Sequence, residues 1–253
     1  MKIVILQTDI VWANPSANIE KADEIINKYD DVDIFVLPEM FSTGFCTNPE
    51  GIAEKYDSGT LEWMKLTAQR KKCAVAGSIA LEDKGRFYNR FYFVHPGGTV
   101  EWYDKKHLFA YGGEHKRFTA GTRRVIVNYK DVRILLQVCY DLRFPVWSRN
   151  RNDYDMAFYV ASWPTPRVEA WKLLLKARAI ENQCYVVGVN RVGKDPNCDY
   201  IGGSAVIDPY GKVIAACEDG KACEAVVEID MSELEAFRKK FPVLNDADPF
   251  EIV

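Results

Sequence analysis

The sequence predicts one layered α/β domain that spans residues 1–253. Short apolar runs, typical of buried strands, recur along the chain, and segments with helical periodicity lie between them. No linker, repeat or low-complexity segment interrupts this pattern. With 253 residues, of which 48% are hydrophobic, the chain is long enough to bury a sizeable core.

Five strands are predicted in the first half of the chain, each from a short apolar or alternating run. They cover residues 2–10, 34–39, 72–80, 86–95 and 99–105. The last two flank a glycine-rich turn and therefore indicate a hairpin. Asn14 followed by Pro15 predicts the start of a helix, and a second helix is expected over residues 58–72. Its core-facing positions would be Leu61, Met64, Leu66 and Ala68.

Apolar runs continue through the second half of the chain. They predict strands within residues 123–139, 155–164, 184–192, 202–216 and 222–230. The longest helix is expected to begin at Pro166, a short one at Pro145 and a last amphipathic one near Ser232. The apolar stripe of the longest helix runs through Val168, Trp171, Leu174, Leu175 and Ala179.

Composition narrows the range of functions. The formal net charge is −3, and the lysines and arginines are scattered, which argues against a nucleic-acid partner. The N-terminal apolar stretch is too short for a signal peptide or a membrane span, so we expect a cytoplasmic protein without membrane attachment. Seven cysteines without C-x-x-C spacing indicate reduced thiols, and three histidines without an H-x-x-x-H pair give no support for a metal site. We therefore expect neither a metal nor another cofactor.

Cys139 is the first candidate for chemistry. It follows an almost unbroken apolar run over residues 134–138, and the chain then turns before Pro145. In layered α/β proteins, the carboxyl end of a buried strand can aim a side chain and the following backbone N–H into one cleft. The alternative is an ordinary buried cysteine, which is a common fate of free cysteine.

Three further residues could activate such a thiol. Glu39 and Lys105 each end a predicted strand, and Glu114 lies in the loop between Lys105 and Cys139. A glutamate can accept the proton of the thiol, and a lysine can stabilise the negative charge that develops after attack. A lysine between two carboxylates would stay protonated and act as a charge stabiliser. The alternatives are a structural ion pair for Glu39 and a solvated surface loop around Glu114.

These residues lie in motifs that resemble those of the nitrilase, or carbon–nitrogen hydrolase, superfamily. The motifs are PEMFSTGF with Glu39, YDKKHLF with Lys105, GGEHKRFTAG with Glu114 and VCYDLRFPVWSRN with Cys139. The family pattern of lysine, any residue, histidine and leucine selects Lys105 over Lys106, and strand alternation agrees that only one of them points inward. The resemblance implies a four-layer αββα sandwich.

The resemblance extends to a bacterial subgroup of omega-amidases. The segments ASWPTPRVEAW, LLKARAIENQCYVVGVNRVG and KKFPVLNDADPF carry it. Members of that subgroup hydrolyse the terminal amide of 2-oxoglutaramate to 2-oxoglutarate and ammonia. The resemblance also implies a homodimer, or a multiple of dimers, that pairs through the helical face near residues 177–183.

A mechanism follows from the resemblance and from thiol chemistry. Glu39 is expected to accept the proton of Cys139, and Lys105 with the backbone N–H of Tyr140 is expected to stabilise the oxyanion on the way to a thioester. Glu114 would help to position Lys105 and the substrate. The expected pocket walls are Phe41, Phe45, Tyr140 and Trp163, and the candidates for binding a substrate carboxylate are Arg143, Arg167 and Arg191.

Other readings remain open at the level of sequence. The same catalytic residues would serve an N-carbamoyl amine amidohydrolase or a nitrilase, because pocket residues decide between these substrates. A dyad of Cys139 with His107 or His115, of the cysteine-protease kind, is a rival arrangement. A non-catalytic binding protein on the same scaffold is the remaining alternative.

Overall fold

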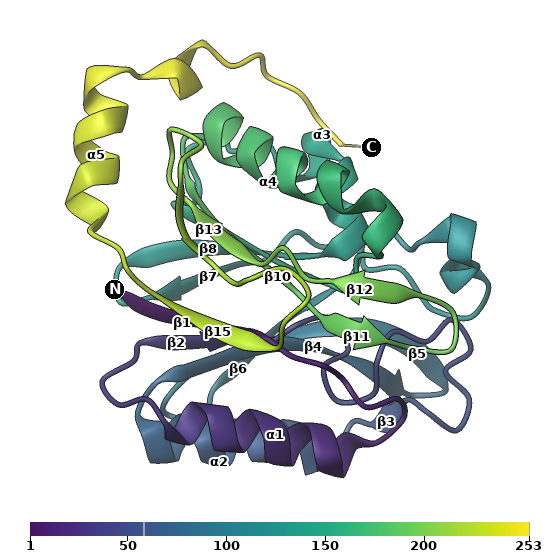
Figure 1. The fold of residues 1–253 in the computed structure, drawn as a ribbon. Helices are drawn as coiled ribbons and strands as arrows, with labels where there is room; N and C mark the ends of the chain where they lie inside the picture. Colours follow the sequence, from purple (N-terminus) through teal and green to yellow (C-terminus); the bar gives the residue numbers. More distant parts are fainter. Residues whose placement is uncertain (58, 253) are drawn as a thin grey trace.

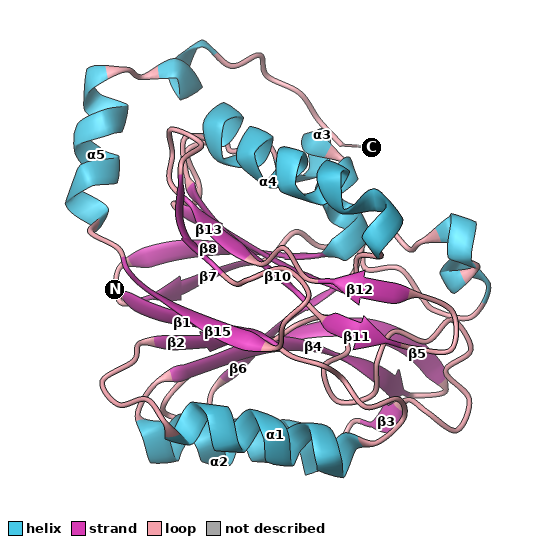
Figure 2. Cartoon of the chain, viewed as in Figure 1, coloured by secondary structure: helices cyan, strands magenta, loops and turns pink. Residues whose placement is uncertain are grey.

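Two β-sheets packed face to face form the centre of the computed structural model, which describes residues 1–57 and 59–252 (Figure 1). Helices cover the outer face of each sheet, so the layers run helix, sheet, sheet, helix (Figure 2). The predicted αββα sandwich is therefore confirmed.

The first sheet has the strand order β15-β1-β2-β4-β5-β6, with β3 paired to β4. Its strands are β1 (Lys2–Gln7), β2 (Ile34–Val36), β3 (Glu54–Lys55), β4 (Ala74–Asp83), β5 (Arg86–Val94), β6 (Val100–Asp104) and β15 (Cys223–Glu228). Helices α1 (Pro15–Asn27) and α2 (Gly59–Lys71) pack on its outer face. Asn14 caps α1 as predicted, since its side chain accepts a hydrogen bond from the Ala17 N–H.

The second sheet has the order β14-β13-β10-β9-β8-β7. Its strands are β7 (Ile126–Tyr129), β8 (Val132–Val138), β9 (Met156–Ala161), β10 (Tyr185–Asn190), β13 (Ala205–Ile207) and β14 (Val213–Ala216). Helix α4 (Val168–Asn182) covers its outer face through Trp171, Leu175 and Ala179. Helix α3 (Pro145–Ser148) is short, and α5 (Met231–Lys240) follows β15.

Two expectations about helices were wrong. Leu66 was expected to face the core, but it is 56% exposed. The neighbouring Thr67 lies on the buried face of α2 instead, together with Leu61, Met64 and Ala68. The longest helix begins at Val168 rather than Pro166, because residues 165–167 form a 3₁₀ turn. The predicted first residue of α2, Ser58, lies outside the described residues.

The arrangement of parallel strands determines where the site forms. Strands β1, β2 and β4 are parallel to one another, and so are β8, β9 and β10. The carboxyl ends of each set therefore lie at one edge of their sheet. A two-stranded hairpin, β11 (Val192–Lys194) with β12 (Asp199–Ile201), follows β10 (Figure 1). Within the described ranges, no helix is both long enough and apolar enough to cross a membrane.

Candidate active site

Cys139 occupies a strained turn immediately after β8. Its φ is +46°, a left-handed conformation that costs a non-glycine residue free energy and is typical of functional sites. A 3₁₀ turn over Cys139–Arg143 starts there, so strand and turn together direct the side chain away from the sheet. The residue is partly accessible and lines a pocket. The Cys139 side chain is therefore partly accessible from the pocket, unlike that of an ordinary core cysteine.

The buried carboxylate of Asp141 holds this turn in place. It accepts hydrogen bonds from the Val138 N–H at 2.9 Å, the Tyr103 hydroxyl at 2.8 Å and the His107 backbone N–H at 3.0 Å. The His107 ring nitrogen Nδ1 also lies 2.8 Å from Asp141. Sequence reasoning missed Asp141, although an acidic side chain directly after a buried strand requires partners.

This contact also bears on the rival cysteine–histidine dyad. The ring of His107 stacks on Phe144 at 3.9 Å between centroids and faces Asp141, whereas His115 is exposed. Neither histidine is among the residues that line the pocket with Cys139. His107 therefore serves as a packing and hydrogen-bonding residue.

Lys105 lies between the two predicted carboxylates and is fully buried with them. Its Nζ is 3.0 Å from Glu39 Oε1 and 2.9 Å from Glu114 Oε2. The neighbouring Lys106 turns away and lies 5.3 Å above the ring of Trp147, which agrees with the expectation that only one of the two lysines points inward. The loop that carries Glu114 is therefore folded inward at this residue and is not a solvated surface loop there.

Two groups that were not predicted complete the hydrogen bonding of the carboxylates. Asn89 Nδ2, from β5, donates to Glu39 Oε1 at 2.7 Å and to Glu114 Oε1 at 3.2 Å. The backbone N–H of Ser162, just after β9, donates to Glu39 Oε2 at 2.7 Å. An asparagine within the aromatic run of β5 was the available signal for the first, since a buried amide needs partners. The Ser162 N–H had no signal in the sequence.

Burial and the two carboxylates determine the charge of the site. Burial by itself lowers the pKa of Lys105, but Glu114 and Glu39 outweigh it, so that the pKa is raised and the ammonium keeps its proton. Burial, with the charge of Glu39, raises the pKa of Glu114 despite the opposing effect of Lys105. Burial and the charge of Glu39 likewise raise the pKa of the Cys139 thiol well above its ordinary value. The resting thiol is therefore protonated and needs a base before it can attack.

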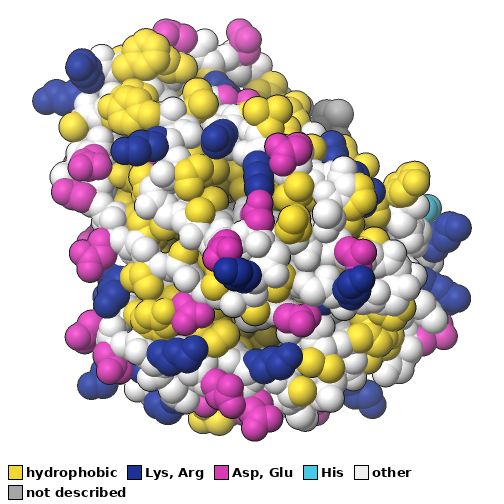
Figure 3. All heavy atoms as spheres, viewed as in Figure 1, with side chains coloured by type: hydrophobic (Ala, Val, Ile, Leu, Met, Phe, Trp, Pro, Cys, Tyr) yellow, Lys and Arg dark blue, Asp and Glu magenta, His cyan; other side chains and the backbone are white. Residues whose placement is uncertain are grey.

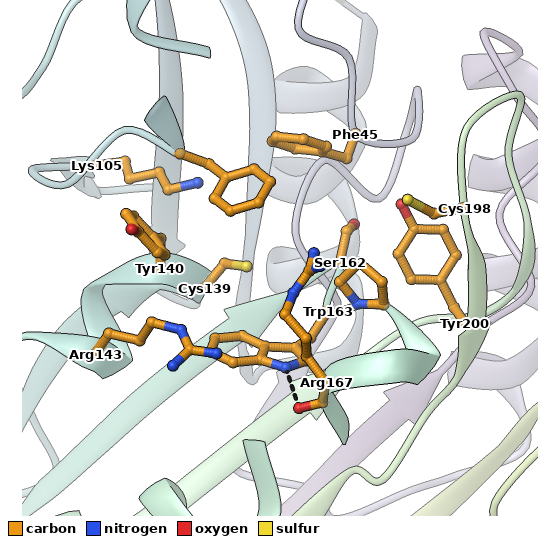
Figure 4. Close-up of a pocket in the computed structure, with 12 residues that line it drawn as sticks. Phe45, Lys105, Cys139, Tyr140, Arg143, Ser162, Trp163, Arg167, Cys198 and Tyr200 are labelled. Carbon is orange, nitrogen blue, oxygen red and sulfur yellow. Dashed lines mark hydrogen bonds between the residues drawn. The ribbon is translucent and has the colours of Figure 1, made fainter. Parts of the chain in front are cut away.

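An apolar pocket opens in front of Cys139. Figure 4 shows Cys139 with Lys105 and Tyr140 on one side and Cys198 with Tyr200, from the β11–β12 hairpin, on the other. The lining residues are Phe45, Lys105, Phe109, Cys139, Tyr140, Arg143, Ser162, Trp163, Pro164, Arg167, Cys198 and Tyr200. Of the predicted walls, Phe45, Tyr140 and Trp163 are present, and so are two of the three candidate arginines. Phe109, Cys198 and Tyr200 had not been predicted.

The structure places Phe41 and Arg191 outside this lining, so these two predictions need correction. Phe41 is buried on the helix side of the first sheet, with its ring 6.0 Å from that of Trp63. Arg191 is fully buried, and its guanidinium donates to the carbonyls of Ile10 and Val192, each at 3.0 Å. It therefore binds main chain and, being fully buried, does not line the pocket.

Comparisons with known proteins agree with this geometry. The family model described as carbon-nitrogen hydrolase matches residues 2–239. The chain is 47% identical to omega-amidase YafV of Escherichia coli (strain K12), over 100% of this chain and 98% of that protein. It is 37% identical to 2-oxoglutaramate amidase of Bacillus subtilis (strain 168), over 96% of each.

A solved structure is similar over its whole length as well. XC1258 from Xanthomonas campestris, described as a CN-hydrolase superfamily protein with an arsenic adduct in the active site, has a TM-score of 0.97 and 38% identity, with 100% of this chain and 99% of that chain covered. Fold, family model and relatives point to one conclusion. The chain belongs to the carbon-nitrogen hydrolase family, the nitrilase superfamily.

Proposed function

We propose that this protein is an omega-amidase that hydrolyses 2-oxoglutaramate to 2-oxoglutarate and ammonia. The observation that carries the proposal is the Lys105 ammonium held between Glu39 and Glu114 beside the strained Cys139, in a pocket that also contains two arginines. The names of the E. coli and B. subtilis relatives, which align over nearly the whole chain, support this substrate.

In the first half of the reaction, Glu39 accepts the proton of the Cys139 thiol, and the sulfur forms a bond with the amide carbon of the substrate. The negative charge moves to the amide oxygen, where the Lys105 ammonium and the Tyr140 N–H stabilise it. Protonated Glu39 then gives its proton to the leaving nitrogen as the C–N bond breaks. Ammonia leaves, and a thioester with Cys139 remains.

In the second half, Glu39 accepts a proton from a water molecule as the water oxygen attacks the thioester carbon. The same two donors stabilise the second oxyanion, and its collapse breaks the C–S bond and returns the proton to sulfur. Hydrogen bonds from Asn89 and Ser162 hold the Glu39 carboxylate in one orientation through both halves. Glu114 acts by fixing Lys105. One carboxylate thus serves both half-reactions.

Arg143 and Arg167 are our candidates for binding the far carboxylate of the substrate. The Arg143 guanidinium lies 4.8 Å from the ring of Trp163, and that of Arg167 lies 5.5 Å from the ring of Phe109. Within the described part of the chain, neither guanidinium forms an ion pair with a carboxylate. Both line the pocket, so a dicarboxylate monoamide would supply the missing negative charge.

The decisive experiment measures ammonia release from 2-oxoglutaramate by wild-type protein and by Cys139→Ala, with succinamate and asparagine as comparison substrates. We expect strong release by the wild type and none above background by the variant. The wild type could release no ammonia from 2-oxoglutaramate while Cys139 still reacts with iodoacetamide faster than the other cysteines. In that case the substrate assignment fails, but the assignment of a thiol-dependent hydrolase is retained. Joint release of ammonia and carbon dioxide from an N-carbamoyl amine would then identify the alternative.

The carboxylate-binding role is tested with Arg143→Gln and Arg167→Gln. Each variant should lose activity on succinamate much more than on a short uncharged amide, because only the former presents a carboxylate. The exposed Arg123 provides a control, and Arg123→Gln should behave as the wild type. Equal losses on both substrates would remove the proposed role.

We further propose a single-domain cytoplasmic enzyme that forms a homodimer through α4. Seven free cysteines fit a reducing compartment. Leu173 and Ile180, on the outer side of α4, are 68% and 53% exposed. Figure 3 shows hydrophobic side chains on the upper part of this face, where α4 and α5 lie, with charges of both signs interspersed among them. A second copy would bury the exposed apolar groups of α4.

A further inference from the structure

Asn190, the last residue of β10, uses the whole hydrogen-bonding capacity of its fully buried side chain. Its Oδ1 accepts from the Trp163 N–H at 2.7 Å and the Arg191 N–H at 3.0 Å. Its Nδ2 donates to the Trp163 carbonyl at 3.0 Å and the Gly202 carbonyl at 2.7 Å. A primary amide has two donor hydrogens and an acceptor oxygen with two lone pairs, so all four are satisfied.

Two of these hydrogen bonds extend the pairing between β9 and β10 through the Asn190 side chain. Strands β9 and β10 pair in parallel as far as Ala161 opposite Asn190. Beyond that point, the Asn190 amide takes the place of a backbone partner and binds both the N–H and the carbonyl of Trp163. The main chain that leaves β9 is therefore fixed at two points, where a chain turning off a strand would otherwise lack a partner.

The fixed segment includes the backbone N–H that orients Glu39. Ser162 lies between Ala161, held by the sheet, and Trp163, held by Asn190. Its N–H donates to Glu39 Oε2 at 2.7 Å, and its hydroxyl to the Glu39 carbonyl at 3.3 Å. Because both flanking residues are held, the direction of the Ser162 N–H depends on Asn190.

The same side chain also holds two walls of the pocket. The Trp163 ring lines the pocket beneath the Arg143 guanidinium. Gly202, the other carbonyl partner of Asn190, follows β12, which carries the lining residue Tyr200. A displacement of the Asn190 amide would thus move the base and both walls together.

We propose that Asn190 is a positioning residue. It keeps Glu39 aligned with Cys139, and it holds Trp163 and Tyr200 in place as walls of the pocket. The inference rests on the proposed function in one respect, namely that Glu39 acts as the base. The simpler alternative is that Asn190 satisfies buried backbone groups and contributes to stability alone.

The test compares Asn190→Ala with a matched variant of a second buried asparagine. Asn182 ends α4 and is also fully buried, and its amide bonds the Asn150 N–H at 2.9 Å and the Arg178 carbonyl at 3.0 Å. None of these three residues lines the pocket. Asn182→Ala should therefore lower the thermal midpoint without changing kcat or KM.

For Asn190→Ala we expect kcat to fall about 10²-fold, the order expected when a reacting group is misplaced by about 1 Å. KM should rise as the walls move. If Asn190→Ala does not fold, Asn190→Ser, whose hydroxyl can still form a hydrogen bond, carries the same comparison with smaller effects in the same directions.

A second readout is independent of the natural substrate. The rate at which iodoacetamide alkylates Cys139 depends on removal of the thiol proton, so Asn190→Ala should slow it and Asn182→Ala should not. If wild type does not hydrolyse 2-oxoglutaramate, the proposed function fails, and the alkylation rates still decide the role of Asn190. Alkylation of Cys139 at the wild-type rate in folded Asn190 variants would overturn the inference.

Discussion

The protonation state of Cys139 distinguishes this site from a cysteine–histidine ion pair. Burial and Glu39 raise the pKa of its thiol, so we expect a neutral thiol at neutral pH. The ultraviolet difference spectrum between wild type and Cys139→Ala should then show no thiolate absorption at neutral pH. A thiolate signal that persists to mildly acidic pH would indicate a positively charged activating partner and would contradict the assignment of Glu39 as the base.

Removal of the Lys105 charge should destabilise the protein. Lys105→Met would leave Glu39 and Glu114 facing each other in a buried site, and removing one partner of a buried ion pair costs about 3–5 kcal/mol. Denaturant unfolding at neutral pH should show this loss together with loss of activity. Lys106→Met is the matched control, because Lys106 is partly exposed over Trp147, and it should change stability little.

The pH dependence of Lys105→Met has a definite sign. The pKa of Glu114 is raised by burial already in the wild type, and the variant removes the positive charge that opposes this. Between its unfolded and folded pKa values, the folded chain then binds more protons at Glu114 than the unfolded chain does, so stability falls as pH rises. Unfolding measurements should therefore show partial recovery at lower pH. Stability of the variant that increases with pH in this range would contradict the account.

At the scale of elements, strand periodicity was the most informative part of the sequence. The apolar end of β8 placed Cys139 at a turn. Strand alternation agreed that only one of Lys105 and Lys106 points inward, but the choice of Lys105 came from the family pattern. Helix periodicity was weaker, as the exposed Leu66 shows, because Thr67 shares the buried face of α2. The pattern of α2 alone did not indicate which of these two neighbours is buried.

The sequence did not predict which distant segments the buried polar side chains would contact. Asn89 on β5 joins Glu39 to Glu114, and Asp141 receives donors from the β6 strand and the loop that follows it. Phe41 and Arg191 were misassigned for the same reason, since the sequence does not say on which side of a sheet a loop aromatic packs or which carbonyl a buried guanidinium meets. Such pairings arise only when the two sheets are assembled.

Helix α5 provides a prediction at this scale. Arg238 connects it to the second sheet by hydrogen bonds. It donates to the Asp155 carboxylate at 2.7 Å and to the carbonyls of Tyr154 and Gln183 at 2.8 and 2.9 Å. Because hydrogen bonds to charged groups contribute about 1.5–3 kcal/mol, Arg238→Met should lower the free energy of unfolding by about that amount at neutral pH. The exposed Lys239 gives the control Lys239→Met, for which we expect no measurable change.

The part of the Arg238 contribution that depends on Asp155 should be lost on acidification. Burial raises the pKa of Asp155, but Arg133 and Arg238 lower it more, so the pKa is depressed in the folded state. A depressed carboxylate stabilises the fold above its unfolded pKa, and this stabilisation is lost as pH falls through the folded pKa. The difference between wild type and Arg238→Met should therefore shrink in denaturant titrations at acidic pH. A difference that is constant with pH would assign the effect to packing of the arginine side chain.

At the scale of the whole molecule, two packed sheets bring together segments that are far apart in the chain. Glu39 and Lys105 follow strands of the first sheet, whereas Cys139 and Ser162 follow strands of the second. The reacting groups thus meet only when the sheets are correctly packed, and the core between them positions the site. Disturbance of sheet packing should therefore affect activity before it abolishes secondary structure.

The outer face of α4 carries the prediction for assembly. Leu173 and Ile180 are both exposed there, and a charge in the centre of a buried apolar interface opposes association because it must be desolvated. Leu173→Glu should therefore shift a dimeric wild type toward monomer in sedimentation velocity at micromolar concentration. The control is Leu66→Glu on α2, which is similarly exposed at 56% but lies on the helix layer of the other sheet and should leave the dimer intact. A wild type that sediments as a monomer at every concentration would show that Leu173 and Ile180 are ordinary surface residues, and dissociation by both variants would place the interface elsewhere.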